Sequence, residues 1–296
     1  MAEVLQQDTA DKAKENNMLI AQLLFEQKPN TAQADSLKAA LEKAVGEVEV
    51  ADGNKSSPMF AVKKYKCVFK DAPQGIPPMA CFTKPYKFEK TLDATLGELN
   101  LSQLWDVENG EELLKRCKWS VSVFAMLGNA LHYKEQAELL LAQVSAALEC
   151  YPGCTAVFVP ASAKLTTAQE FRSNARYDIG VRFIKLAVNA RFFNIQGTGD
   201  MLVDTIGMYA FGAPDVQVHF RGLDPNAVVQ YVYNLTSYQY ENEFPIENGD
   251  TIDGLGEDGN IALNVQWKGQ YENSLIQPVR LVLDINCGKY AAGQRD

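Results

Sequence analysis

Runs of apolar residues and regular alternation between apolar and polar residues occur along most of the chain. Residues 18–25 form a short apolar run that ends before Pro29, and residues 119–126 alternate clearly, so both segments are predicted strands. The same patterns predict strands at residues 48–50, 59–69, 79–88, 155–159, 182–195, 200–209, 215–220, 261–267 and 279–285.

Helical periodicity is found in fewer segments. Apolar residues recur at steps of three and four over residues 34–45 and 131–150, which predicts two amphipathic helices. Shorter helices are predicted at residues 110–117, from Thr167 onward, and at residues 224–235, where Asp224 is a suitable N-cap followed by proline.

These elements predict an α+β fold, because strands are too numerous for a helical bundle and helices too few for a doubly wound sheet. We expect mixed or antiparallel sheets with helices packed on one face, built from ferredoxin-like split βαβ units. A chain of 296 residues is expected to form two lobes. The expected N-terminal lobe spans residues 18–176 and the C-terminal lobe residues 177–290, flanked by a flexible arm at 1–17 and a tail at 291–296.

Charge and cysteine usage narrow the function classes. The chain has 28 basic and 37 acidic residues, a net charge of −9, which disfavours binding to nucleic acid or to an anionic membrane surface. Six scattered cysteines are typical of free thiols, and neither a secretion signal nor an apolar run of about 20 residues is present. We therefore expect a cytoplasmic protein whose partner is another protein or a small molecule. The sequence does not predict its oligomeric state.

Three phrases carry a family resemblance: residues 23–29, residues 118–123 and residues 203–215. Together they resemble the bacterial domain-of-unknown-function family DUF4261, over nearly the whole chain. The most specific part runs from Asp204 to Asp215. The resemblance implies a bacterial cytoplasmic protein, and it supplies no catalytic residue because the family has no assigned activity.

No cofactor or metal site is expected. Residues 254–259 spell a dinucleotide fingerprint, but Glu257 and Asp258 would repel phosphates and a strand follows where a helix is required, so we interpret the segment as a hairpin loop. The acids around it lack the spacing of a calcium loop. Cys150 and Cys154 lack the second pair of ligands that a zinc site needs.

Four residues are candidates for ligand binding. Arg172 and Arg176 could clamp an anion with their forked donors, or pair with surface acids. Asp204 and Asp215 bracket a glycine-rich segment and could act as paired carboxylates, or the glycines there could simply shape a bulge and a turn.

Histidine chemistry is a weaker alternative. His132 and Glu135 are three residues apart near a helix start, and His219 lies in an alternating strand, but no nucleophile motif accompanies them. No residue is assigned as catalytic.

The leading functional hypothesis is a non-enzymatic module that binds a protein or a small ligand, of which an antitoxin-like or immunity protein is one specific form. The alternative is an enzyme acting on a small anionic substrate at an inter-lobe site that uses Asp204, Asp215 and an arginine. Whether the protein is an enzyme is left open, although the non-enzymatic reading is favoured.

Overall fold

A computed structural model describes residues 18–52, 57–88 and 101–293, which contain two compact units. The N-terminal unit comprises residues 18–52, 57–88 and 104–187, and the C-terminal unit comprises residues 101–103 and 188–293. The expected arm at residues 1–17 lies outside the described residues. The fold is α+β, as the hydrophobic pattern predicts, with helices packed on largely antiparallel sheets.

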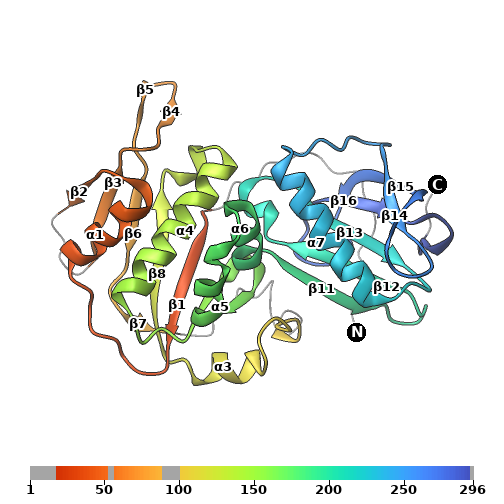
Figure 1. The fold of residues 1–296 in the computed structure, drawn as a ribbon, viewed down its shortest axis with the longest axis horizontal. Helices are drawn as coiled ribbons and strands as arrows, with labels where there is room; N and C mark the ends of the chain where they lie inside the picture. Colours follow the sequence, from red (N-terminus) through yellow and green to blue (C-terminus); the bar gives the residue numbers. More distant parts are fainter. Residues whose placement is uncertain (1–17, 53–56, 89–100, 294–296) are drawn as a thin grey trace. The chain divides into compact units, whose positions relative to one another are not determined.

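An eight-stranded antiparallel sheet forms the core of the N-terminal unit (Figure 1), in the order β10-β9-β1-β8-β6-β3-β2, with β7 also paired to β8. Its strands are β1 (Ile20–Phe25), β2 (Val48–Asp52), β3 (Met59–Val62), β6 (Met79–Phe82), β7 (Tyr86–Lys87), β8 (Trp119–Met126), β9 (Ala156–Val159) and β10 (Lys164–Thr167).

The expected split βαβ unit is present at the centre of this sheet. Strand β1 pairs antiparallel with both β8 and β9, so β8 and β9 run parallel to each other with β1 between them. Helix α4 (Tyr133–Cys150) connects β8 to β9 and contacts both β1 and β8. The apolar side of α4 therefore covers the middle of the sheet.

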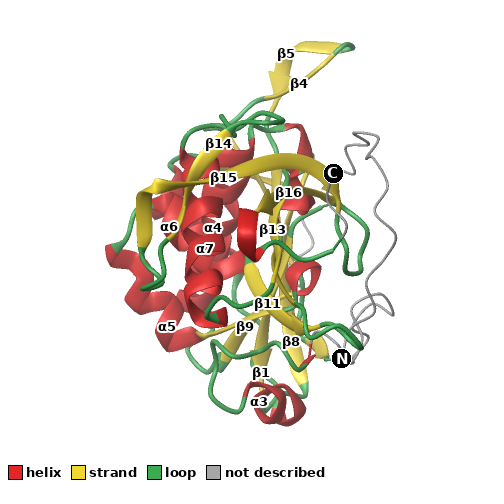
Figure 2. Ribbon diagram, turned by 90° about the vertical axis from the view of Figure 1, so that its right-hand side faces the viewer, coloured by secondary structure: helices red, strands yellow, loops and turns green. Residues whose placement is uncertain are grey.

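Helices cover one face of this sheet. Helix α1 (Ala34–Val45) packs beside α4 (Figure 1), and α6 (Ile179–Ala187) contacts α4, β9 and β10. Figure 2 shows α4 and α6 on the same side of β1 and β8. The remaining elements of the unit are α3 (Gly110–Arg116), α5 (Ala168–Ser173), the hairpin of β4 (Cys67–Phe69) and β5 (Ala72–Ile76), and single 3-10 turns at Gly128–Ala130, Pro160–Ser162 and Asn174–Arg176. No helix among the described residues is long and apolar enough to cross a membrane.

The expected strand at residues 182–195 is wrong in its first half. Residues 182–187 belong to α6, and only Asn189–Asn194 form a strand, β11. Gly180, Phe183, Ile184 and Ala187 are buried at helical spacing, so α6 packs against α4. For this reason the division between the units falls after Ala187, whereas the sequence places it between residues 176 and 177.

A six-stranded sheet forms the C-terminal unit, in the order β11-β12-β13-β16-β15-β14. Neighbours are antiparallel except β13 and β16, which are parallel. Besides β11, its strands are β12 (Met201–Ile206), β13 (Asp215–Phe220), β14 (Thr251–Leu255), β15 (Ile261–Asn273) and β16 (Leu281–Asn286). Two 3-10 turns follow β12 and β16, at Met208–Phe211 and Gly288–Tyr290. Part of the expected tail joins this sheet, because Ala291 forms a β-bridge with Phe220.

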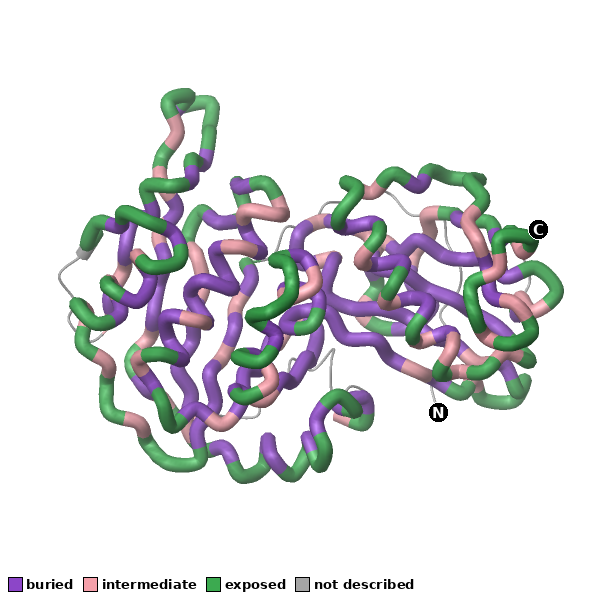
Figure 3. The backbone as a smooth tube through the Cα atoms, viewed as in Figure 1, coloured by how far each residue is buried: buried purple, intermediate pink, exposed green. Residues whose placement is uncertain are grey.

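Helix α7 (Pro225–Glu241) covers one face of this second sheet. The Asp224 carboxylate accepts a hydrogen bond from the Asn226 N–H and caps the helix, which extends six residues beyond the expected end. The helix packs on β11, β12 and β13 around a core that includes Val203, Val218 and Leu283. Every residue of β13 is buried, so this strand is enclosed on both faces (Figure 3).

The replacement Leu283→Ala is expected to destabilise the C-terminal unit by about 2–5 kcal/mol, because the Leu283 side chain is fully buried and its loss leaves a cavity. Urea unfolding monitored by circular dichroism measures the change. The matched variant Leu263→Ala, at a position 80% exposed, should change the unfolding free energy by less than about 0.5 kcal/mol. Equal effects at both positions would contradict the assigned core.

Candidate functional site

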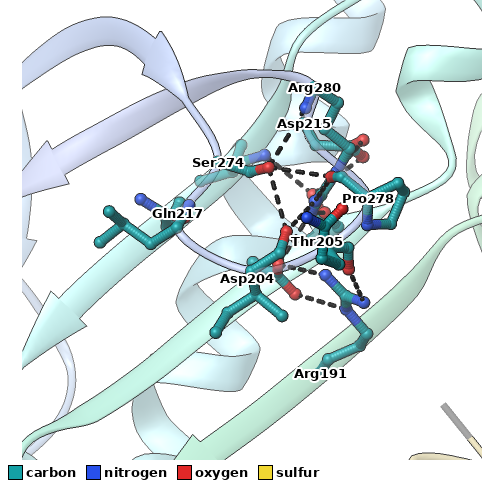
Figure 4. A network of polar contacts seen from close by, with 12 residues as sticks. Arg191, Asp204, Thr205, Asp215, Gln217, Ser274, Pro278 and Arg280 are labelled. Carbon is teal, nitrogen blue, oxygen red and sulfur yellow. Dashed lines mark hydrogen bonds and ion pairs between the residues drawn. The ribbon is translucent and has the colours of Figure 1, made fainter. Parts of the chain in front are cut away.

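A buried network of ion pairs occupies the sheet face opposite α7 in the C-terminal unit (Figure 4). Asp204 on β12 lies directly across from Arg191 on β11, and the two form a bidentate pair with Nε–Oδ1 and Nη2–Oδ2 distances of 2.8 and 2.5 Å. Arg280, just before β16, links the two predicted acids. Its Nη2 is 2.8 Å from Asp204 Oδ2 and its Nε is 3.0 Å from Asp215 Oδ2.

The carboxylate of Asp215 has further donors around it. It accepts hydrogen bonds from the Thr205 hydroxyl and from the N–H groups of Met208 and Tyr209, at 3.3, 3.0 and 3.3 Å. These two N–H groups belong to the 3-10 turn that follows β12. The glycine-rich segment between the two acids is therefore held against β13 by Asp215.

Arg280 also fastens the loop at residues 274–280 onto the sheet. Its guanidinium donates to the carbonyls of Thr205, Ile276 and Pro278 at 2.6, 3.2 and 3.1 Å. Nearby, Gln217 on β13 donates to Asp284 at 2.8 Å and accepts a hydrogen bond from the Leu275 N–H at 2.8 Å. Four main-chain groups, three carbonyls and the Leu275 N–H, thus have side-chain partners.

The charges of this network balance. Two guanidinium groups face two carboxylates, and burial is complete for Asp204, Asp215 and Arg191. Burial raises the pKa of Asp204, but the attraction of Arg191 and then of Arg280 outweighs it, so the pKa of this carboxyl lies below its ordinary value. The arrangement is suited to holding the loop and strands together. As ligand-binding residues, Asp204 and Asp215 stay predictions.

Sequence reasoning did not select Arg191 or Arg280. One signal was available: Arg191 occupies the middle of an apolar alternating strand, where an unpaired charge would be costly. The sequence could not identify Asp204 as its partner, because that pairing depends on the register between β11 and β12.

The two predicted arginines belong to the N-terminal unit and have different surroundings. Arg172 donates to the carbonyl of Leu148 in the last turn of α4 at 3.3 Å, and it lines a cavity of about 330 Å³ together with Arg182 and Glu149. Arg176 lies over the ring of Tyr177 at 4.8 Å. Arg172 and Arg176 thus belong to the N-terminal unit, whereas Asp204 and Asp215 belong to the C-terminal unit.

The histidines have local partners. The main-chain N–H of His132 donates a hydrogen bond to Glu135 Oε2 at 3.2 Å. This bond is part of the capping box at the start of α4. His219 is buried on β13 with its Nε2 3.8 Å from Asp200 Oδ2. Within the described residues, no group of three or more histidines, cysteines and acids is placed to hold a metal ion.

A groove of about 600 Å³ lies between α7 and the edge strand β14 of the C-terminal unit. The hydroxyl of Tyr231 on α7 donates to the carbonyl of Asp253 on β14 at 3.0 Å and joins the two walls. Tyr238 and Ile261, which are 50% and 54% exposed, supply apolar surface to the groove. A large apolar side chain that is half exposed beside a groove is a typical feature of a binding surface.

The lining of the groove includes two acids, Asp250 and Asp253, and no basic residue. All of its lining residues fall between positions 222 and 267, a stretch of 46 residues that contains no lysine, arginine or histidine. Eight acids lie in the same stretch: Asp224, Glu241, Glu243, Glu247, Asp250, Asp253, Glu257 and Asp258. The absence of basic residues over such a length indicates an acidic surface, but it does not predict the groove itself.

Comparison with known proteins gives one match. The model of the family described as a domain of unknown function (DUF4261) matches residues 204–286. Over these residues the chain resembles the DUF4261 family. The three phrases predict a resemblance over nearly the whole chain, whereas the matched part runs from Asp204 in β12 to the end of β16. This part includes Asp204, Asp215 and Arg280 of the network, but not Arg191, and it includes the groove that β14 borders.

No curated protein and no solved structure matched the chain.

Replacing Arg280 with methionine is expected to lower the free energy of unfolding by about 3–5 kcal/mol, because Asp215 and one oxygen of Asp204 lose a buried cationic partner. The matched variant Arg116→Met removes an exposed pair with Glu26 and should change stability little. Urea titration of both variants measures the difference. A similarly small effect at both arginines would show that the buried network does not stabilise the fold.

The depressed pKa of Asp204 predicts acid sensitivity. An unfolded aspartate has a pKa of about 3.9, so between that value and the lower folded pKa the unfolded state binds more protons than the folded state. The stabilisation by Asp204 is complete above pH ~5 and is lost as the pH falls through the folded pKa. Urea midpoints between pH 6 and pH 2 should fall less steeply in Asp204→Asn than in the parent protein. Parallel profiles would contradict this assignment.

Proposed function

We propose that this protein is a non-enzymatic interaction module whose acidic groove binds a cationic segment of a partner protein. The observation that carries the proposal is the groove between α7 and β14, which combines exposed apolar side chains with acids and has no basic residue between positions 222 and 267. A partner segment that carries lysines or arginines beside apolar residues would match both properties.

Electrostatics support a cationic partner over other classes. Asp250 and Asp253 line the groove, and the whole chain carries a net charge of −9, so the surrounding field attracts cations and repels phosphate backbones. Such a field raises the rate of encounter with a basic partner and also disfavours pairing between two copies of the chain. Charge therefore contributes mainly to the choice of partner.

Apolar contacts would supply much of the affinity. Tyr238 and Ile261 line the groove, and Leu263 lies two residues beyond Ile261 and is 80% exposed. Burial of apolar area contributes about 25 cal/mol per Å² removed from water. A small inorganic cation would leave these three side chains exposed, so a peptide segment is the better match.

An antitoxin-like or immunity role is the finer form of this proposal. In such a role an acidic protein neutralises a basic partner by covering its surface, and the acidic groove is consistent with that. Placement in the cytoplasm is part of the same proposal and is supported by the free thiols of the six cysteines. The alternative of an enzyme built on Asp204 and Asp215 has less support, because Arg191 and Arg280 already neutralise both carboxylates.

A labelled octapeptide of alternating lysine and valine should bind the protein, whereas the glutamate–valine analogue should not. The double variant Asp250→Asn with Asp253→Asn keeps an acceptor oxygen for the hydrogen bonds that these side chains make, and should weaken lysine–valine binding by up to about fivefold per charge removed. Fluorescence anisotropy at low and high salt measures both effects.

The control is Glu108→Gln with Glu112→Gln, which removes the same charge from exposed positions of the N-terminal unit. Binding should be unchanged in this control. If the lysine–valine peptide does not bind, or if both double variants weaken its binding equally, the groove is not the binding site.

A further inference from the structure

Among the residues that the structure describes, the main chain of β14 has a side without a strand partner. Strand β14 is at the edge of its sheet and is paired there with β15 alone. The Gly269 N–H donates to the Asp250 carbonyl at 2.9 Å, which makes the facing residues Thr251 and Lys268 a non-hydrogen-bonded pair. The N–H and C=O of Thr251 therefore point away from β15, toward the outer edge of the sheet.

The main-chain N–H and C=O of Asp253, two residues after Thr251 on the strand, also point away from β15. Its carbonyl accepts the hydrogen bond from the Tyr231 hydroxyl, which confirms that this side of β14 faces α7. A β-bulge between Asp253 and Gly254 then ends the regular pairing. Three main-chain groups remain directed outward for an added strand: the N–H and C=O of Thr251 and the N–H of Asp253.

The two faces of β14 differ in chemistry. Ile252 faces Trp267 across the ladder and packs toward the core beneath α7, where Trp267 contacts the ring of Tyr231. Asp253 lies on the opposite face, where its carboxylate accepts a hydrogen bond from Gln266 at 2.7 Å. One face of the edge is thus apolar and bordered by α7, and the other carries Thr251 and Asp253, with Lys268 of β15 directly across from Thr251.

We propose that the partner segment binds by adding to β14 as an antiparallel strand, with its basic side chains on the Asp253 face and its apolar side chains on the α7 face. This inference rests on the proposed function and specifies its recognition mode. Directly opposed residues of antiparallel strands project to the same face, so the residue hydrogen-bonded to Thr251 would be the basic one. The ligand is therefore an extended segment in which basic and apolar residues alternate.

Acids on an edge strand also have a protective role, because charge and bulges deter edge-to-edge pairing between copies of a protein. Both functions follow from the same residues. Asp250 and Asp253 would repel a second copy of this acidic edge and attract a cationic strand. The edge would therefore pair with a cationic strand and not with a second copy of the chain.

The test uses three forms of the acetylated lysine–valine octapeptide: unmodified, methylated on the main-chain nitrogens of the lysines, and methylated on those of the valines. Methylation removes N–H donors from one edge of the strand while composition and charge stay equal. The lysine-methylated form should bind at least tenfold more weakly than the unmodified peptide. The valine-methylated form should bind within about threefold, because its methyl groups would lie on the edge of the peptide that does not pair with β14.

The outcomes separate this inference from the proposed function. If the unmodified peptide does not bind, the proposed function itself fails. If it binds and the two methylated forms are equally strong or equally weak, the groove binds cationic segments but strand addition is excluded. A loss confined to the valine-methylated form would refute the antiparallel arrangement, since the outward and inward residues would then be exchanged.

Discussion

The guanidinium of Arg280 is the interaction on which the C-terminal unit depends. It is buried and donates to Asp204 on β12, to Asp215 on β13 and to the carbonyls of the loop that precedes β16. A buried charge is costly unless opposite charges and acceptors surround it, and here they do. One side chain therefore holds together two strands and the loop between β15 and β16.

This network gives the second sheet two different faces. On the α7 side, apolar residues such as Val203, Val218 and Leu283 form an ordinary core. On the other side, the ion pairs and the Gln217–Asp284 pair fix the register of β11, β12, β13 and β16, because a slip by one residue would bury each charge without its partner. Strand β14 is one of the two edges of this sheet, and it is remote from the network in the strand order.

Placing function at that edge fits the distribution of charge. The carboxylates of the network are neutralised by arginines, whereas Asp250 and Asp253 lie in a stretch without any basic residue. Of these two groups of carboxylates, only Asp250 and Asp253 carry a charge that could attract a cationic partner. The match to the DUF4261 family covers Asp204, Asp215 and Arg280 as well as the proposed binding surface, whereas Arg191 on β11 lies outside it.

The sequence by itself determined the α+β class, most of the strands, the long helix α4 and the cap of α7, because these depend on local periodicity and on capping chemistry. It failed at residues 182–187, where helical spacing was hidden within a segment that also reads as apolar strand. It selected Asp204 and Asp215 but not their arginines, since Arg191 and Arg280 reach them only through strand register and a returning loop. The groove was decided by tertiary structure alone: α7 and β14 form its walls only after the chain has folded back through residues 242–250 and paired β14 with β15.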